Sequence, residues 1–250
     1  MTRLCQRCGK PVHVGFKFCN VCGEPVNDDG ASAGDVVSYS PLLGIRGRPL
    51  RVLTGDHAGQ FYDAFPAVTV GRNNADIVSA DPTVSPVHAR LDATESGAQI
   101  QDMDSLNGVF VRTKDEKTLL HDNDIIRAGD HLFLFEVIAL DRYSEESGTE
   151  FYAAPLRGEN FRLVEILAGG MRGRACVATD GCITVGRSEG DFVFPDDEKM
   201  SPRHFSIRWS QRGGLLIDVA FNGTFVQIHD VEAIARGDIF FIGNELYEMM

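Results

Sequence analysis

The sequence has no long apolar run, and this absence excludes a membrane-spanning helix. Its most apolar window, HLFLFEVIAL at 131–140, is short and contains Glu136, whereas a helix that crosses a bilayer needs about 20 apolar residues. The first ten residues, MTRLCQRCGK, also lack the apolar core of a secretory signal. We therefore expect a cytoplasmic protein with no membrane partner.

Basic residues are too few to predict broad nucleic-acid binding. The chain has 24 Lys and Arg against 36 Asp and Glu, which gives a net charge of −12. Residues 1–26 contribute +3 and the remainder contributes −15. Contact with a phosphate backbone depends on clustered Lys and Arg. Only the short N-terminal segment is a candidate for such contact, and +3 is weak evidence for it.

Helical periodicity is missing as well, because no 3.6-residue apolar period persists for three turns. Short β-branched or aromatic runs stand in its place, bounded by Gly, Asp or Asn: PAVTV, AQIQDM, GVFVRT and HLFLFEVI. Runs of this kind predict strands. Several short strands with turns every 8–12 residues are typical of a sandwich or a barrel. The expected fold class is all-β.

Cysteine is scarce except near the N-terminus. Four of the six cysteines form two Cys-x2-Cys pairs ten residues apart, each pair followed by glycine: Cys5, Cys8, Cys19 and Cys22. Four thiolates at this spacing surround a tetrahedral Zn²⁺ with no open position, so we predict one structural zinc ion. In a segment too small for a core, the metal would supply the folding energy. The stretch resembles the zinc-ribbon modules at the N-termini of many bacterial proteins.

Two disulfides or a redox Cys-x-x-Cys pair are the alternatives to zinc. Disulfides do not suit a chain without a secretion signal. A redox pair would not need duplication, nor would it lie outside a βαβ context. His13 lies between the two pairs, and with four thiolates present we expect it to be solvated. Cys176 and Cys182 show no such pattern and are expected to be core thiols.

The remainder of the chain contains an internal repeat. The blocks VTVGR, VSPVH, IQDMDSLNGVFV and DNDIIRAGDHLFLF recur as ITVGR, MSPRH, LLIDVAFNGTFV and RGDIFFIGNELYEM, with corresponding residues 114 to 116 positions apart. Two stretches rich in Gly, Ser and acidic residues read as flexible linkers. The predicted division is a zinc ribbon at 1–26, a linker at 27–48, a first β domain at 49–140, a linker at 141–160 and a second β domain at 161–250.

The repeated blocks resemble the forkhead-associated (FHA) domain, whose motifs are Gly-Arg, Ser-x-x-His and Asn-Gly-Thr in that order. The first repeat has Gly71-Arg72, Ser85 to His88 and Asn107-Gly108, and the second has Gly186-Arg187, Ser201 to His204 and Asn222-Gly223-Thr224. The resemblance covers nearly all of 49–139 and 161–249. It implies two eleven-stranded β-sandwiches in tandem, each binding a phosphothreonine peptide with the loops at one end.

The resemblance assigns roles to the matching residues. Arg72 and Arg187 would grip the phosphate, Ser85 and Ser201 would donate a hydroxyl bond to it, and Asn107 and Asn222 would hold the peptide backbone. These residue types suit the task, because a guanidinium can engage two oxygens of a dianion at once. His88 and His204 would brace the Ser loops from inside. Supporting positions are Gly71, Gly108, Gly186, Arg203, Gly223 and Thr224.

Two other interpretations of these motifs remain. A Ser/His hydrolase needs an oriented third group and an oxyanion hole, and the sequence supplies neither, so we predict that the protein is not an enzyme. Alternatively, the polar residues only satisfy turns, where such residues are favoured. Gly108 and Gly223 would then belong to Asn-Gly tight turns.

The sequence departs from the family pattern beside the predicted sites. Many phosphothreonine-binding members have Thr just before the Asn, but Leu106 and Phe221 stand there. Pro86 and Pro202 follow the two serines and have no N–H to donate. One lost hydrogen bond to a charged group costs about 1.5–3 kcal/mol. The second repeat adds Ser188 and Arg203, but the acids of EGDFVFPDDEK would repel phosphate or select a basic flank.

The leading hypothesis is a non-enzymatic adaptor that binds phosphorylated proteins or peptides in Ser/Thr kinase signalling, with a kinase or its substrate as partner. The alternative is a phosphate-independent scaffold, motivated by the apolar Leu106 and Phe221. Nucleic-acid contact through the zinc ribbon is a weaker third possibility. Thr149 in the acidic linker is a candidate phosphorylation site that a neighbouring repeat would capture.

Overall fold

The computed structural model describes residues 2–4, 11–13, 49–114, 117–138, 148–149, 152 and 160–250. The chain divides into two compact units, Met1–Ser40 and Pro41–Met250. In the first unit, β1 (Thr2–Leu4) pairs antiparallel with β2 (Pro11–His13). Cys5, Cys8, Cys19 and Cys22, the predicted zinc ligands, lie outside the described residues, as do the linker at 27–48 and most of the linker at 141–160.

The second unit is built from short strands, and its described part contains one 3₁₀ turn, η1 (Ala168–Gly170), as its helical element. Buried and less buried residues alternate along many strands, as in β3, because successive side chains point to opposite faces of a sheet. The strands of the first repeat are β3 (Pro49–Val52), β4 (Phe61–Asp63), β5 (Ala67–Gly71), β6 (Ile77–Val78), β7 (Ala89–Ala93), β8 (Gly97–Asp102), β9 (Val109–Arg112), β10 (Thr118–Leu120), β11 (Ile125–Ala128) and β12 (His131–Val137).

The second repeat contributes a matching series of ten strands. These are β13 (Phe161–Leu167), β14 (Met171–Val177), β15 (Cys182–Gly186), β16 (Phe192–Val193), β17 (Phe205–Ser210), β18 (Gly213–Asp218), β19 (Phe225–Gln227), β20 (Val231–Ala235), β21 (Ile239–Ile242) and β22 (Glu245–Met249). The all-β prediction is confirmed.

The two repeats exchange their last three strands. One five-stranded sheet has the order β20-β8-β7-β5-β6 and another has the order β10-β18-β17-β15-β16, so each contains one strand of the other repeat. The third sheet, of ten strands, runs β14-β13-β12-β11-β19-β9-β21-β22-β3-β4. Within it, β22 of the second repeat pairs with β3 of the first, and β12 of the first pairs with β13 of the second.

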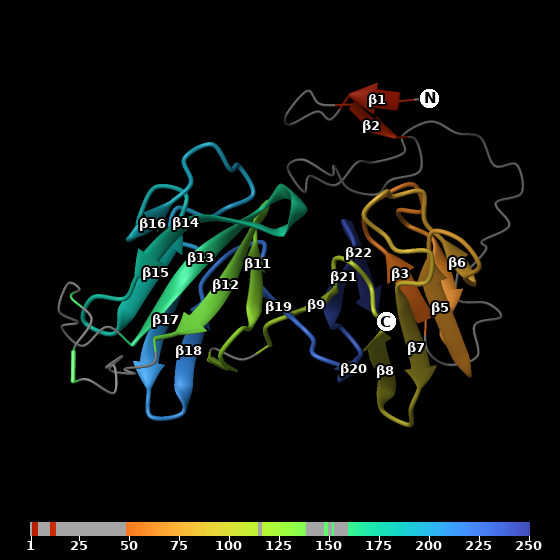
Figure 1. Ribbon diagram of the computed structural model, residues 1–250. Helices are drawn as coiled ribbons and strands as arrows, with labels where there is room; N and C mark the ends of the chain where they lie inside the picture. Colours follow the sequence, from red (N-terminus) through yellow and green to blue (C-terminus); the bar gives the residue numbers. More distant parts are fainter. Residues whose placement is uncertain are drawn as a thin grey trace, which may run out of the picture. The chain divides into compact units, whose positions relative to one another are not determined.

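Two sandwiches result, and each combines both repeats. Sandwich A consists of β3–β9 with β20–β22, and sandwich B consists of β13–β19 with β10–β12. Each has ten strands in the described part of the chain, against the eleven that the resemblance implies. The repeats at 49–140 and 161–250 therefore do not coincide with the two sandwiches, because each sandwich includes three strands of the other repeat. Figure 1 shows β9 and β19 next to each other where the two sandwiches join.

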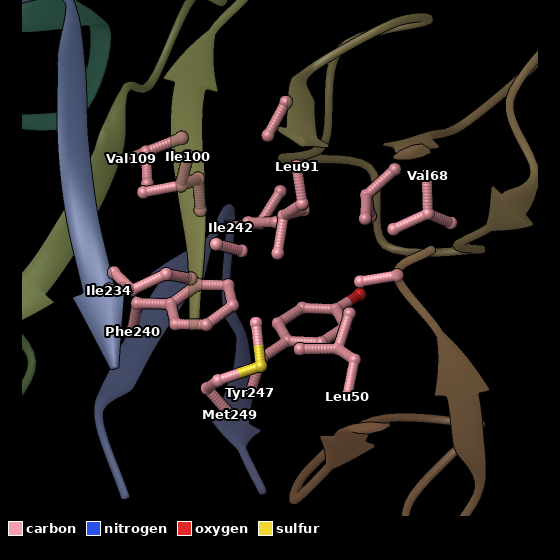
Figure 2. Packing of buried hydrophobic residues seen from close by; sticks show 14 of the residues in the cluster. Leu50, Val68, Leu91, Ile100, Val109, Ile234, Phe240, Ile242, Tyr247 and Met249 are labelled. Carbon is pink, nitrogen blue, oxygen red and sulfur yellow. The ribbon is translucent and has the colours of Figure 1, made fainter. Parts of the chain in front are cut away.

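The hydrophobic cores follow the same exchange. The core of sandwich A contains residues of the first repeat such as Leu50, Val68 and Leu91 (Figure 2). Packed among them are six residues of the second repeat: Ile228, Ile234, Phe240, Ile242, Tyr247 and Met249. The core of sandwich B receives five residues of the first repeat in return: Leu120, Ile126, Ala128, Phe133 and Phe135. Burial of a large apolar side chain contributes about 1.5–3 kcal/mol, so the exchanged strands stabilise the sandwiches they enter.

The crossing between the sandwiches is hydrogen-bonded on both sides of the β9–β19 pair. Phe225 pairs with Arg112, and Gln227 pairs with Phe110. Beyond the strands, the backbone N–H of Thr113 donates to the carbonyl of Thr224 at 2.9 Å. On the other side, the N–H of Ile228 donates to the carbonyl of Val109 at 3.0 Å. The crossing therefore continues the sheet, and these backbone groups find their hydrogen-bond partners in the other repeat.

Candidate functional site

In the first repeat, the Gly-Arg loop and the Ser-x-x-His loop are joined through their backbones. The N–H of Arg72 donates to the carbonyl of Ser85 at 2.9 Å, and the N–H of Asn73 donates to the carbonyl of Pro86 at 3.0 Å. The Arg72 side chain is exposed. The structure thus brings Arg72 and Ser85, which are 13 positions apart in the sequence, to adjacent places at one end of sandwich A.

The Asn-Gly turn is joined to the same loops. The N–H of Leu106 donates to the Ser85 hydroxyl oxygen at 3.1 Å, and Asn107 Nδ2 donates to the carbonyl of Thr83 at 2.7 Å. A hydroxyl oxygen that accepts a bond still has its own hydrogen to donate. Ser85 can therefore offer that hydrogen to an acceptor outside the loop, such as an oxygen of a bound phosphate.

His88 braces the two loops from within the sandwich. Its side chain is fully buried, and its Nδ1 accepts a bond from the backbone N–H of Ser85 at 3.0 Å. Its Nε2 lies 3.1 Å from the carbonyl of Gly108, to which it donates in the neutral tautomer that this arrangement requires. Burial lowers the pKa of His88 below its ordinary value near 6.5. Neither ring nitrogen bonds the Ser85 hydroxyl, and this is not the geometry of a nucleophile and its base.

The second repeat reproduces this arrangement in sandwich B. Arg187 N–H donates to the carbonyl of Ser201 at 2.9 Å, and the N–H of Phe221 donates to the Ser201 hydroxyl oxygen at 3.2 Å. His204 accepts from the Ser201 N–H at 3.1 Å and lies 3.2 Å from the carbonyl of Gly223. Burial lowers the pKa of His204 as well. Asn222 Nδ2 donates to the carbonyl of Lys199 at 2.8 Å.

The glycine of each Gly-Arg pair is required by close packing. A Cβ on Gly71 would overlap the carbonyl oxygen of Pro86, and a Cβ on Gly186 would overlap that of Pro202. The prolines that cannot donate a hydrogen bond therefore supply carbonyls that tie the two loops together. Gly186 is further restricted, because the same Cβ would also approach the carbonyl oxygen of Glu189.

The apolar residues beside the asparagines are almost fully exposed. Leu106 is 89% exposed and Phe221 is 91% exposed. Their backbones orient Ser85 and Ser201, while their side chains project into solvent next to the candidate site. Thr224 behaves differently, because it is fully buried and its hydroxyl donates to Asp218 at 3.0 Å. Its role in this structure is to fix the turn. The Arg203 side chain is exposed on its loop.

Several residues that hold the site were not found from the sequence. The carbonyls of Thr83 and Lys199 position the two asparagines, and both residues lie two places before the site serine, a match that aligning the repeats could have revealed. Arg112 comes from the other repeat and donates from Nη2 to the carbonyl of Phe221 at 3.4 Å. No local pattern points to that contact, since it depends on the strand exchange.

Comparison with protein families identifies the repeats. The model of the FHA domain matches residues 68–129 and 183–243. The chain carries two FHA domains in tandem. FHA domains are phosphothreonine-binding modules, and they act in interactions and not in catalysis.

Two solved structures are similar to parts of this tandem FHA chain. The FHA domain of the CT664 protein from Chlamydia trachomatis has 12% sequence identity and a TM-score of 0.34, covering 81% of this chain and 95% of that one. Mycobacterium tuberculosis EmbR, in complex with a low-affinity phosphopeptide, has 33% identity and a TM-score of 0.24, covering 36% of this chain and 24% of that one. No curated protein matches the chain. The family assignment therefore rests on the domain matches.

Two further findings concern the described residues alone. None of their helices is long and apolar enough to cross a membrane. Within the same residues, no group of three or more His, Cys, Asp or Glu side chains could hold a metal ion.

Proposed function

We propose that this tandem FHA chain is a non-enzymatic adaptor that binds phosphothreonine peptides of proteins in Ser/Thr kinase signalling. The observation that supports this function is that both repeats gather the same three residue types at one cluster of loops. In each, the Gly-Arg loop bonds to the Ser loop, and the Ser hydroxyl bonds to the Asn turn. Guanidinium, hydroxyl and carboxamide groups together suit a phosphate dianion on a peptide backbone.

A phosphothreonine peptide library, measured against the full chain, tests the proposal. Arg72→Ala and Arg187→Ala should each remove part of the phosphate-dependent binding, and the double variant should remove it all. Loss of a hydrogen bond to a charged group costs about 1.5–3 kcal/mol, or roughly 10- to 150-fold in affinity. Arg212→Ala is the matched control, because this arginine is exposed and lies outside the candidate sites.

Equal binding of phosphorylated and unphosphorylated peptides would contradict phosphothreonine recognition. It would favour the second candidate function, a phosphate-independent scaffold, for which the exposed Leu106 and Phe221 are the specific observation. Apolar side chains exposed beside a loop cluster are typical of a protein-binding patch when they are contiguous with other apolar surface. In that case Leu106→Ser with Phe221→Ser should abolish capture of a partner that survives phosphatase treatment.

We also propose that Cys5, Cys8, Cys19 and Cys22 hold one structural Zn²⁺. The Cys-x2-Cys spacing supports this, and in the sequence the first pair falls between the partnered strands β1 and β2. The zinc would fix the fold of the N-terminal unit and take no part in chemistry. Elemental analysis should find one zinc per chain, and Cys19→Ser with Cys22→Ser should release it. A metal-free chain with two disulfides would contradict the proposal.

A further inference from the structure

A cleft of about 680 Å³ lies between the two sandwiches and opens beside the candidate site of the second repeat. Sandwich A contributes the loop at Thr54–Asp56, Asp81 and the residues around Asn244. Sandwich B contributes Lys199, Asn222 and Phe225. Because its walls come from both sandwiches, the cleft exists only when the strand exchange holds them together.

Two aromatic side chains, Phe225 and Phe241, line the cleft, and we call this part of the lining its floor. The rings of Phe225 and Phe241 lie 4.7 Å apart, edge to face. The Arg127 guanidinium stacks over Phe241, 3.7 Å from the ring centroid. Its polar edge is occupied, since it donates to the carbonyl of Gly243 at 2.8 Å and to Asn244 Oδ1 at 2.7 Å. Arg127 therefore completes the floor and has its hydrogen bonds within the protein.

The charge of the lining is negative. Two bases line the cleft, Arg127 and Lys199, against four acids, so the net charge of the lining is −2; the acids are Asp56, Asp81, Asp130 and Glu245. Lys199 is paired with Asp130 at 2.6 Å, and the buried Glu245 accepts a bond from Tyr247 at 2.7 Å. Asp56 is exposed and has no hydrogen-bond or ion-pair partner within the described part of the chain. Arg127 donates its hydrogen bonds to neutral acceptors, so its positive charge remains, and the lining as a whole keeps a net charge of −2 with Asp56 as its exposed acid.

Asp81 is also held in its charged form. Burial raises its pKa, but hydrogen bonds from Thr83 and Asn244 outweigh burial, and the net pKa lies below the usual range. The bonds measure 2.9 Å from the Thr83 N–H and 2.8 Å from the Asn244 N–H. Asp81 is therefore a second carboxylate, in addition to Asp56, among the residues that sandwich A contributes to the cleft.

The cleft adjoins the group expected to hold a bound peptide. Asn222 lines the cleft, and its side chain is fixed by the carbonyl of Lys199, which also lines it. A peptide whose backbone bonds Asn222 would pass the mouth of the cleft within a few residues of its phosphothreonine. A cationic side chain at that point of the peptide would match the charges of Asp56 and Asp81.

We propose that this cleft binds a Lys or Arg side chain of the ligand, so that one phosphopeptide contacts both sandwiches. The aliphatic stem would pack against the partly exposed Phe241, and the charged head would pair with Asp56. This inference rests on the proposed function of the second repeat, because phosphothreonine binding brings the peptide to the cleft. The ligand class is a phosphothreonine peptide with a basic residue at one fixed distance from the phosphate.

The test uses the full chain carrying Arg72→Ala, which leaves the second site to report alone. The probe is a library with fixed phosphothreonine and five degenerate positions on each side, together with its unphosphorylated counterpart. We expect Lys and Arg to be enriched at one position. Asp56→Asn should lower that enrichment about two- to fivefold, as for the loss of an exposed ion pair. Asp56→Lys should change the residues enriched at that peptide position from Lys and Arg to Glu and Asp. Asp180→Asn is the control, since Asp180 is exposed, lies outside the cleft and has a positive φ that Asn tolerates.

The outcomes separate this inference from the proposed function. Phosphate-dependent binding with no enrichment of Lys or Arg would overturn the inference that the cleft binds a basic side chain. Enrichment that Asp56→Asn and Asp56→Lys leave unchanged would overturn it as well. Both outcomes leave phosphothreonine recognition intact. Basic enrichment in both libraries that falls with Asp56→Asn supports the cleft and overturns phosphate dependence. Loss of both the phosphate dependence and the basic preference overturns both.

Discussion

Phe240→Ala changes a residue of the second repeat, but it is expected to destabilise sandwich A, which carries the candidate site of the first repeat. Phe240 belongs to β21 of the second repeat, and its side chain is fully buried in the core of sandwich A. It stacks on Tyr247 with ring centroids 5.7 Å apart and pairs with Val111 of the first repeat. Truncation of a buried Phe costs about 3–5 kcal/mol, because the lost burial is accompanied by a cavity.

Hydrogen exchange, measured for the amides of each strand, reports the destabilisation of sandwich A directly. Amides of β5, β7 and β8, all in the first repeat, should exchange about a hundred- to several-thousandfold faster if opening of sandwich A limits their exchange. Amides of β15, β17 and β18 in the second repeat should keep most of their protection, because their core does not contain Phe240.

Phe133→Ala is the mirror variant. Phe133 lies in β12 of the first repeat and is fully buried in the core of sandwich B. It should therefore release β15, β17 and β18 and spare β5, β7 and β8. If Phe240→Ala instead released the strands of its own repeat, each repeat would be folding on its own C-terminal strands, and the exchanged arrangement would be refuted.

Three further predictions concern pH, packing and charge. The pKa values of His88 and His204 are lowered in the folded chain, so below about pH 6.5 the unfolded chain binds more protons than the folded chain. The free energy of unfolding should therefore fall as the pH decreases below 6.5, until the pH passes the folded-state pKa values. Urea unfolding across pH 4.5–7.5 would measure this, and replacing both histidines by Gln should flatten the slope. Gly71→Ala should displace its loop at a cost of about 1–3 kcal/mol and abolish peptide binding at the first site only, seen by calorimetry with the second site silenced. His131→Glu should destabilise sandwich B by about 1–3 kcal/mol in thermal unfolding, because it sets a second carboxylate beside the buried Glu165, and His131→Gln should restore most of the loss. An unchanged unfolding midpoint for His131→Glu would count against this account.

The last of these predictions bears on why the strands are exchanged. His131 lies 3.1 Å from Glu165 of the other repeat, and its counterpart at the same place in β22 is Glu245, 114 positions later. If each repeat kept its own strands, Glu245 would enter sandwich B and lie near Glu165. Two carboxylates in a buried site repel and lose solvation. In the exchanged arrangement Glu165 has His131 at 3.1 Å and Arg174 at 3.2 Å, so the charge at this one position favours the exchanged pairing.

Local patterns in the sequence predicted the all-β fold, and the resemblance of the repeated motifs to the FHA family predicted the tandem FHA domains. The same motifs recur at a nearly constant offset, and motif residues such as Gly71 have a local physical reason that any copy of the loop would share. The roles of Arg72, Ser85 and Asn107 remain predictions until binding is measured, although the loops that carry them are hydrogen-bonded together.

The strand exchange and the cleft were decided only by the tertiary structure. Each repeat contains a complete set of strand patterns, and the periodicity of a strand such as β21 says which face is buried but not which sheet receives it. That choice depends on contacts between the two repeats, among them Phe240 with Val111, which are 129 positions apart, and His131 with Glu165. The sequence by itself determined the modules and their motif residues, because these follow from local backbone and side-chain chemistry. Only the folded chain determined which strands complete each module, because that depends on the packing and charge of distant partners.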